Sequence, residues 1–287
     1  MERFLAVDWG TTNRRGWIVD ADTAVPVFAD DRGILNVADF AGEVRALRTH
    51  NAGMPLLMAG MIGSNRGWVD VPYVAAPAGL AGIAAGVHWV EAGVGIVPGI
   101  AIDEPPRADV MRGEEVQLLG ALALAQIGDG LVCHPGTHTK WAEIDLGQIA
   151  RFRTVMTGDV FAALAAHSIL SDLLAHPAPV DDAFLAGVDY ALEHFDLTAE
   201  LFTVRARVVL GRAAASHAAS YVSGLLIGTD VRTGLGRLRA DVVPVLGAPE
   251  LTARFAAALA RAGRQALELD GGAAFVAGMR AGAGAAA

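Results

Sequence analysis

Two segments of the chain share one pattern, in which an apolar run, a bend of glycine and threonine, and a second apolar run follow one another. The first bend is DWGTTN at residues 8–13, and the second is PGTHTK at residues 135–140. Each pattern predicts two strands joined by a tight polar turn. Because the pattern recurs, we expect a chain built from two related halves.

Bends of this composition are suited to binding phosphate. Glycine and threonine expose backbone N–H groups and hydroxyls without bulk, so the bend can wrap phosphate oxygens. Two bends on either side of a cleft can hold the two ends of a triphosphate. An ordinary Asx-type hairpin is the alternative for either bend alone. The phosphate-binding residues that we expect are Gly10, Thr11, Thr12, Asn13, Gly136, Thr137, His138, Thr139 and Lys140.

Asp8 closes the first apolar run, directly before the first bend. A carboxylate at such a strand end can hold Mg²⁺ directly or through water, since Mg²⁺ prefers oxygen ligands. We therefore expect Asp8 near a metal ion.

An acid pair begins a predicted helix between the two bends. Apolar residues at helical spacing predict this helix over residues 113–125, with Glu114 and Glu115 in its first turn. A carboxylate there can act as general base on a substrate hydroxyl, although complementarity with the helix dipole also explains it. Arg112, just before the pair, can clamp a carboxylate.

A polar loop at residues 59–68, AGMIGSNRGW, follows a predicted buried strand. Its small and hydrogen-bonding residues can bind hydroxyl groups, and Trp68 and Tyr73 nearby indicate a wall against which a sugar packs. The substrate-binding residues that we expect are Met61, Gly63, Ser64, Asn65, Arg66, Tyr73 and Arg112.

The second half contains mostly helical patterns, at residues 159–174, 181–194, 216–227 and 250–267. Between the last two, a strand at 242–246 ends in a glycine/alanine turn where a nucleoside ring can lie against the backbone. We expect adenosine contacts from Gly247, Ala248 and Leu251. The alternation of strands and helices predicts an α/β fold. We place the domains at residues 1–120 and 121–287, and expect the glycine/alanine tail after Arg280 to fray.

Composition excludes several classes of protein. The chain has 287 residues, a formal net charge of −9 and one cysteine, Cys133. The acidic balance argues against nucleic acid as a partner. No run approaches the about 20 strongly apolar residues of a membrane span. One cysteine excludes a disulfide framework and suits the cytoplasm, which is the location that we expect. Neither a Walker A motif nor a GxGxxG after the first strand occurs, which argues against P-loop and Rossmann sites.

Together these segments resemble the sugar kinases of the actin/hexokinase/Hsp70 superfamily, and among them the 2-dehydro-3-deoxygalactonokinase family. The resemblance rests on AVDWGTTNRRGW at 6–17, MAGMIGSNRGW at 58–68, PY at 72–73, VMRGEEVQLLGA at 110–121, PGTHTKW at 135–141, FRTVMTGDV at 152–160, SGLLIG at 223–228 and VLGAPELTARF at 245–255. These segments span nearly the whole chain.

The resemblance implies two ribonuclease-H-like domains around an interdomain cleft that holds ATP and Mg²⁺. The two bends would be the phosphate elements, with Asp8 near the metal. Residues 247–251 would be the adenosine element, although its usual glycine pair is Gly247-Ala248 here. Related kinases carry a catalytic aspartate where this chain has two glutamates. We prefer Glu114 as the base, with Glu115 second.

The resemblance also implies transfer of the ATP γ-phosphoryl group to the terminal 6-hydroxyl of 2-dehydro-3-deoxy-D-galactonate in D-galactonate catabolism. Arg66 and Arg112 are candidates to bind the substrate carboxylate. One alternative is a kinase for another sugar acid, such as 2-keto-3-deoxygluconate, on the same fold. Another is an ATP-driven conformational switch. The alanine/glycine-rich helices leave a homo-oligomer open.

Overall fold

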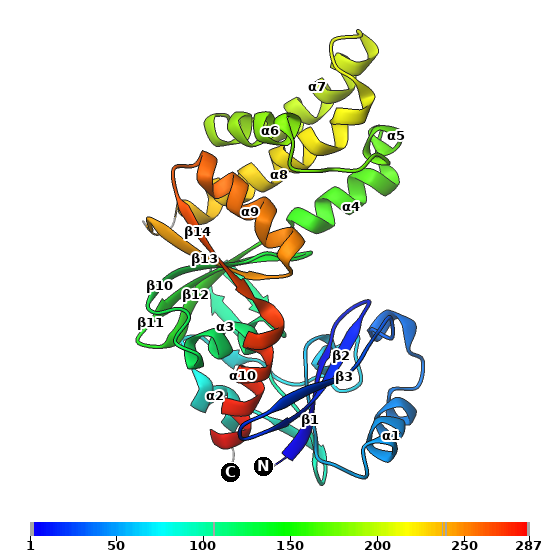
Figure 1. Ribbon diagram of the computed structural model, residues 1–287, viewed down its shortest axis with the longest axis vertical. Coiled ribbons are helices and arrows are strands. Elements are labelled where there is room, and N and C mark those ends of the chain that lie inside the picture. The colour runs from blue at the N-terminus through cyan, green and yellow to red at the C-terminus, as the bar shows by residue number, and fades with distance from the viewer. Residues whose placement is uncertain (1–2, 106, 237, 239, 286–287) are drawn as a thin grey trace. The chain divides into compact units, whose positions relative to one another are not determined.

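The computed structural model describes residues 3–285 apart from Pro106, Arg237 and Arg239 (Figure 1). The chain divides into two compact units. Unit 1 comprises Met1–Asp129, Glu143–Phe152 and Gly271–Ala287, and unit 2 comprises Gly130–Ala142 and Arg153–Asp270. Among the described residues, no helix is both long and apolar enough to cross a membrane.

Unit 1 is built on a six-stranded sheet with the order β3-β2-β1-β4-β7-β6. The strands are β1 (Arg3–Trp9), β2 (Arg14–Asp20), β3 (Ala24–Asp30), β4 (Leu56–Ala59), β6 (His88–Glu91) and β7 (Val94–Ile96). β1, β2 and β3 pair antiparallel, whereas β4 and β7 run parallel to β1. The apolar run Phe4–Val7 is fully buried in β1, as its composition predicts. A smaller sheet contains β5 (Val74–Ala75), β8 (Ile100–Glu104) and β9 (Arg107–Met111).

The helices of unit 1 are α1 (Phe40–His50), α2 (Leu80–Ala85), α3 (Glu114–Ala123) and α10 (Gly271–Ala285), with 3₁₀ turns η1 (Ile34–Asn36) and η2 (Met61–Gly63). Asp39 caps α1, where Gly42 N–H donates to its Oδ1 at 2.8 Å. The helix expected over residues 113–125 is confirmed as α3, which directly follows Gly113.

The tail after Arg280 is helical to Ala285, so the expectation that it frays is wrong for these residues, and residues 286 and 287 lie outside the described residues. α10 packs against α3 through glycines that let the two backbones approach (Figure 1). A Cβ on Gly120 would lie 1.8 Å from Ala274 O, and one on Gly278 would lie 2.1 Å from Val116 O. Because of this contact, the C-terminal helix groups with unit 1, whereas the sequence analysis divides the chain at residue 120.

Unit 2 repeats the strand order of unit 1. Its sheet has the order β12-β11-β10-β13-β14, matching β3-β2-β1-β4-β7 position by position. The strands are β10 (Gly130–His134), β11 (Thr139–Asp145), β12 (Gln148–Val155), β13 (Val242–Gly247) and β14 (Gln265–Asp270). The middle part of the β11–β12 hairpin, residues 143–152, groups with unit 1. The two related halves predicted from the repeated bend are thus confirmed.

The helices of unit 2 are α4 (Thr157–His167), α5 (Ser171–Leu174), α6 (Asp182–Glu193), α7 (Leu197–Val209), α8 (Ala218–Leu235) and α9 (Pro249–Arg261), with the 3₁₀ turn η3 (Ala215–His217). The prediction of a helix over residues 250–267 is wrong for residues 262–267. α9 ends at Arg261, Gly263 adopts φ +69°, and the following residues form β14. Glycine in this conformation ends a helix readily.

Candidate functional site

The first bend is held by the segment that follows β3. Consecutive N–H groups at residues 33–35 donate to the carbonyl oxygens of residues 10–12, at 3.0 to 3.1 Å. The backbone N–H groups of residues 11–13 make no hydrogen bond within the described part of the chain, and these residues are exposed. Three open donors on one bend suit the binding of an anion.

Asp8 is the next-to-last residue of β1, beside this bend, and is partly buried, with a side chain 17 % exposed. Its Oδ2 lies 2.6 Å from Nη2 of Arg15, the residue opposite it on β2. The described residues contain no group of three acidic, histidine or cysteine side chains able to hold a metal. A single carboxylate still suits Mg²⁺, which keeps several waters and binds substrate phosphates. Arg15 was missed by the sequence analysis, although strand pairing across the bend would have located it.

Two glycines bring the acid pair to this end of the sheet. Gly60, after β4, and Gly113, before α3, both have positive φ, at +95° and +110°. A Cβ on Gly113 would lie 3.2 Å from the Cα of Gly60, and one on Gly60 would lie 2.8 Å from Trp9 O. The start of α3 therefore packs next to the ends of β4 and β1.

The two acids differ in their access to solvent. Glu115 is fully buried, and both of its carboxyl oxygens accept from Gly113 N–H, at 2.8 and 2.7 Å. Burial, and then the charge of Glu114, raise the pKa of Glu115 to about 8. Glu114 is half-buried, and its Oε2 accepts from Arg112 N–H at 3.0 Å. Of the pair, Glu114 is the carboxylate that a substrate can reach.

Arg112 is a buried cation with unused donors. Its side chain is 8 % exposed, Nη2 donates to Val71 O at 2.7 Å, and Cζ lies 4.1 Å from the centre of the Tyr73 ring. Nε and Nη1 have no hydrogen-bond partner among the described residues. Gly63 leaves room beside them, because a Cβ there would lie 3.0 Å from Nη1. Burying a charge without partners is costly, so this geometry favours an anionic ligand.

The polar loop uses some of its predicted residues internally. Ser64 is buried, and its Oγ donates to Met61 O at 2.7 Å, which closes the turn η2. The side chains of Asn65 and Arg66 are exposed. The structure therefore brings Gly63, Tyr73 and Arg112 together, and makes Ser64 part of the loop's own structure.

The second bend is packed against the start of α4. Asp159 N–H donates to Thr137 O at 3.1 Å, and a Cβ on Gly158 would lie 2.9 Å from the Cα of Thr137. His138 Nε2 lies 3.5 Å from an Asp159 oxygen. Gly136, Thr137 and His138 reach solvent, whereas Thr139 and Lys140 are buried. Lys140 Nζ donates to Thr154 Oγ1 at 2.8 Å.

A buried carboxylate on α8 ties these elements together. Asp230 is fully buried, and it accepts from Trp141 Nε1 at 2.6 Å and from Thr157 Oγ1 at 2.5 Å. Burial raises its pKa to about 6, and the hydrogen bonds from Thr157 and Trp141 oppose that shift. Asp230 thus joins β11, α4 and α8 next to the bend. The sequence analysis missed it, although a lone acid in the apolar stretch 222–231 is a signal.

A pocket of about 120 Å³ opens within unit 2, among the second bend, α4, α8 and α9. It is lined by Gly136, Thr157, Gly158, Phe161, Ser223, Leu226, Ile227, Leu251, Arg254 and Phe255. Two of these, Gly136 and Leu251, are sequence-predicted nucleotide contacts. Gly247 and Ala248 lie at the end of β13 and the start of α9, close to the same bend, since a Cβ on Gly247 would be 3.5 Å from Pro135 O. The apolar lining with a few polar groups is typical of a small-ligand site.

Comparisons with known proteins agree along the whole chain. The family model described as 2-keto-3-deoxy-galactonokinase matches residues 8–281. The 2-dehydro-3-deoxygalactonokinase of Escherichia coli (strain K12) is 36% identical over 283 residues, covering 97% of this chain and 96% of that protein. A probable 2-dehydro-3-deoxygalactonokinase of Rhizobium meliloti (strain 1021) is 35% identical over 298 residues, covering 98% of this chain and 96% of its own.

A crystal structure from Sinorhizobium meliloti, of a candidate 2-dehydro-3-deoxygalactonokinase, has a TM-score of 0.90 with this chain. The two are 34% identical, and the match covers 98% of each chain. The predicted fold class, an α/β actin-like ATPase fold with two ribonuclease-H-like units, is thereby confirmed. By the family model and by these relatives, the chain belongs to the 2-keto-3-deoxy-galactonokinase family.

Proposed function

We propose that this protein is an ATP-dependent sugar-acid kinase, which phosphorylates the terminal 6-hydroxyl of 2-dehydro-3-deoxy-D-galactonate in D-galactonate catabolism. Membership of the family and the names of its relatives support the reaction. The structural observation that carries the proposal is Arg112, a buried cation with two unused donors in the same unit as an open phosphate-binding bend. A neutral sugar offers no anion to such a cation, whereas a sugar acid does.

Glu114 is the proposed general base. It is the member of the acid pair that reaches solvent, and it lies at the start of α3, beside the ends of β4 and β1. There it orients the substrate hydroxyl and accepts its proton as the phosphoryl group transfers. Glu115 acts differently, because its carboxyl group is used by Gly113 N–H. We propose that Glu115 stabilises the turn that positions Glu114.

Arg112 is the proposed carboxylate ligand. Its guanidinium is fixed by Val71 O and by the Tyr73 ring, so little conformational freedom is lost on binding. Nε–H and Nη1 point to different sides of the guanidinium, so one carboxylate cannot bridge them, and Nη1, beside Gly63, is the proposed donor to a carboxylate oxygen. Asn65 and Arg66 are exposed on the polar loop of residues 59–68, and we propose that they contact the remaining substrate hydroxyls.

Nucleotide contacts are proposed for each unit by itself. In unit 1 the N–H groups of residues 11–13 would bind phosphate, and in unit 2 the exposed part of the second bend would bind phosphate and the pocket would take adenosine. Asp8 would hold Mg²⁺, which neutralises charge on the transferring phosphoryl group when it is bound. Most of the rate then comes from positioning and electrostatic stabilisation.

Product analysis tests the assignment. The purified protein is incubated with Mg²⁺-ATP and the sugar acid, and the product is examined by ³¹P NMR. We expect a phosphomonoester whose phosphorus couples to the protons of C6. Phosphorylation at another carbon would overturn the regiochemistry, and ATP hydrolysis that ignores the acceptor would favour a conformational switch. Three statements remain predictions: the reaction depends on Mg²⁺, the protein is located in the cytoplasm, and it forms a homo-oligomer.

A further inference from the structure

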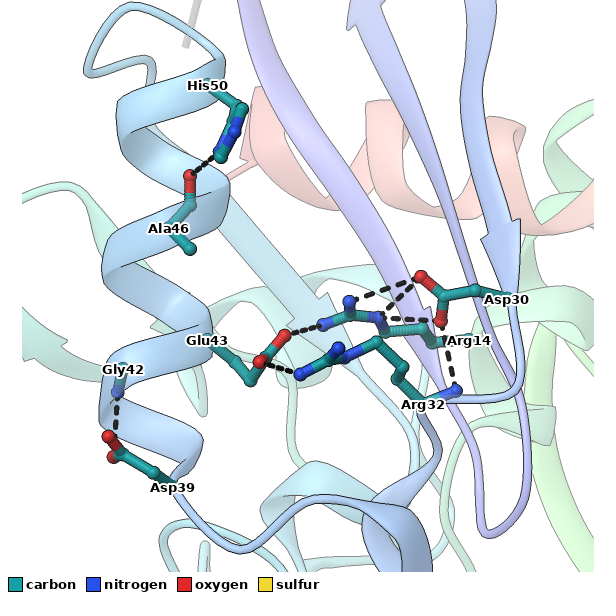
Figure 2. A network of polar contacts seen from close by, with 8 residues as sticks. All are labelled: Arg14, Asp30, Arg32, Asp39, Gly42, Glu43, Ala46 and His50. Carbon is teal, nitrogen blue, oxygen red and sulfur yellow. Dashed lines mark hydrogen bonds and ion pairs between the residues drawn. The ribbon is translucent and has the colours of Figure 1, made fainter.

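A network of four charged side chains lies next to the first bend (Figure 2). Arg14, the first residue of β2, is 6 % exposed. Its Nε donates to Asp30 Oδ1 at 2.9 Å and its Nη2 to Asp30 Oδ2 at 3.1 Å. Its Nη1 lies 3.0 Å from Glu43 Oε2 on α1. One buried guanidinium thus joins β2, β3 and α1.

Arg32 completes the network from the loop after β3. Its guanidinium pairs with Glu43 Oε1, and its backbone N–H donates to Asp30 Oδ1 at 3.0 Å. Figure 2 shows Arg14 and Arg32 meeting on the Glu43 carboxylate. Arg32 is therefore fixed through both its side chain and its backbone.

Arg32 directly precedes the segment that holds the bend. Residues 33–35 donate three N–H groups to the carbonyl oxygens of residues 10–12. At Gly33 the approach is closest, because a Cβ there would lie 2.3 Å from the carbonyl carbon of Thr12. Gly33 has φ −66°, which any residue adopts, so the contact with the bend is what requires glycine.

Arg14 itself is held away from solvent. Arg14 stacks on two rings, with Cζ 4.9 Å from the centre of Trp9 and 5.3 Å from that of Phe28. A buried guanidinium that loses one of its paired carboxylates is still removed from water, but the attraction that offset this cost is gone. Loss of Asp30 or Glu43 must therefore shift the loop that carries Arg32, and with it residues 33–35.

We propose that Arg14, Asp30, Arg32 and Glu43 form a positioning network for nucleotide binding. It fixes residues 33–35, which turn the carbonyl groups of residues 10–12 inward and leave the N–H groups of residues 11–13 open for phosphate. The inference rests on the proposed function, since that function assigns the bend to ATP. The four side chains act through the bend and do not touch phosphate.

The first test is Asp30→Asn, compared with the wild type by calorimetric titration with Mg²⁺-ATP. We expect the Kd for ATP to rise about tenfold, which corresponds to about 1.4 kcal/mol. KM for the sugar acid should stay within about twofold, because Arg112 lies on another segment. The matched control is Glu91→Gln, which removes the Arg48–Glu91 ion pair of 2.9 Å in the same unit and does not reach the bend.

A second pair of variants guards against misfolding of Asp30→Asn. Arg32 is half exposed, so Arg32→Gln is expected to fold normally, and thermal melting checks this. Arg32→Gln should weaken ATP binding, and Arg32→Lys, which keeps the charge, should restore most of it. A purely structural role would not produce this rescue in ATP affinity at unchanged melting temperature.

Amide hydrogen exchange supplies a readout that needs no nucleotide. In Asp30→Asn and in Gly33→Ala, residues 33–35 should exchange faster than in the wild type, and in Glu91→Gln they should not. Unchanged ATP affinity in Asp30→Asn and Arg32→Gln overturns the network proposal, whatever the exchange rates. If the wild type binds ATP but phosphorylates no acceptor, the proposed function is wrong. The ATP affinities of the variants would then still test the network. A wild type that binds no ATP would defeat both.

Discussion

Gly113 lies against Gly60, and the contact places the acid pair of α3 at the end of the central strands of unit 1. A Cβ on Gly113 would come within 3.2 Å of the Cα of Gly60. Both residues have positive φ, a conformation that side chains rarely adopt. The chemistry assigned to Glu114 thus depends on two residues that have no side chain.

Gly113→Ala should therefore lower kcat by at least about tenfold, because the added methyl group pushes α3 and its acids away from β4. Gly147→Ala is the matched control. Gly147 also has positive φ, at +70°, but nothing lies within 4 Å of its added Cβ. The kcat values of the two variants, measured by steady-state kinetics, separate the effect of displacing the acids from the effect of backbone strain alone. Equal losses in both would show that the contact with Gly60 does not matter.

Glu114→Gln should reduce kcat by about 10²–10⁴-fold, the usual contribution of a general base. Its affinity for ATP should be unchanged, since the expected nucleotide contacts lie elsewhere. Glu115→Gln should lose much less, because an amide oxygen can still accept from Gly113 N–H. Single-turnover kinetics measure both. Near-normal turnover in Glu114→Gln with loss in Glu115→Gln would reverse the assignment.

The stability of the protein should depend on Glu115 at alkaline pH. Its pKa is about 8 in the folded state, above the ordinary 4.5, so the folded state binds the proton more tightly than the unfolded chain. The associated stability is fully present below pH 4.5 and is lost as the pH rises through 8. The slope is at most about 1.4 kcal/mol per pH unit.

Urea unfolding at pH 6 and pH 9 measures this effect, with Glu115→Gln as the comparison. The wild type should lose more unfolding free energy between the two pH values than the variant, whose amide does not titrate. Equal losses in the two proteins would indicate that the pKa of Glu115 in the folded state is close to its ordinary value.

Arg112→Gln should raise KM for the sugar acid by about 10–100-fold, since a hydrogen bond to a charged group contributes about 1.5–3 kcal/mol. Affinity for ATP should stay within about twofold, because Arg112 is not among the expected nucleotide ligands. The same loss is expected when the wild type receives the substrate amide in place of the carboxylate. Additive losses from the substitution and the amide, measured as a double-mutant cycle, would show that Arg112 and the carboxylate do not interact.

Asp230→Asn should destabilise unit 2 by about 1–3 kcal/mol, because a buried donor is left without an acceptor. Asparagine offers one oxygen where Asp230 serves both Trp141 and Thr157. ATP affinity should also fall, since α4 packs against the second bend. Denaturant unfolding and nucleotide titration test the two effects. Wild-type values in both would contradict the role of Asp230 as the tie between α8 and the bend.

The sequence predicted the elements whose signal is local. The strands that flank the two bends and the helix after Gly113 all appear where the pattern places them. The α/β class followed from the alternation of strands and helices, and the ribonuclease-H-like fold from the family resemblance. The repeated bend predicted two related halves, which the structure shows as two sheets of like strand order.

What the sequence did not predict depends on contacts between distant segments. α10 is a glycine/alanine helix without a strong amphipathic pattern, and its packing on Gly120 of α3 makes it stable. The helix expected to reach Leu267 stops at Arg261, because Gly263 takes a left-handed conformation and β14 pairs with β13. α7 was not expected either.

The same limit applies to the candidate site. Residue type alone singled out Arg112 and the acid pair, but burial separates Glu115 from Glu114 and reveals the unused donors of Arg112. Asp230 and Arg15 were missed because their partners lie far away in the chain or across a bend. Ser64 and Lys140 look like ligands in the sequence, yet both are buried and bonded within their own units.

The measurement that tests the central claim most directly is ADP release with Mg²⁺-ATP and a panel of acceptors. The panel holds 2-dehydro-3-deoxy-D-galactonate, 2-keto-3-deoxygluconate, galactonate, gluconate and neutral hexoses. We expect selective turnover of the first acid and none of the neutral sugars, because the role proposed for Arg112 requires a carboxylate. Turnover of neutral hexoses at a comparable kcat/KM, or ADP release that no acceptor stimulates, would contradict it.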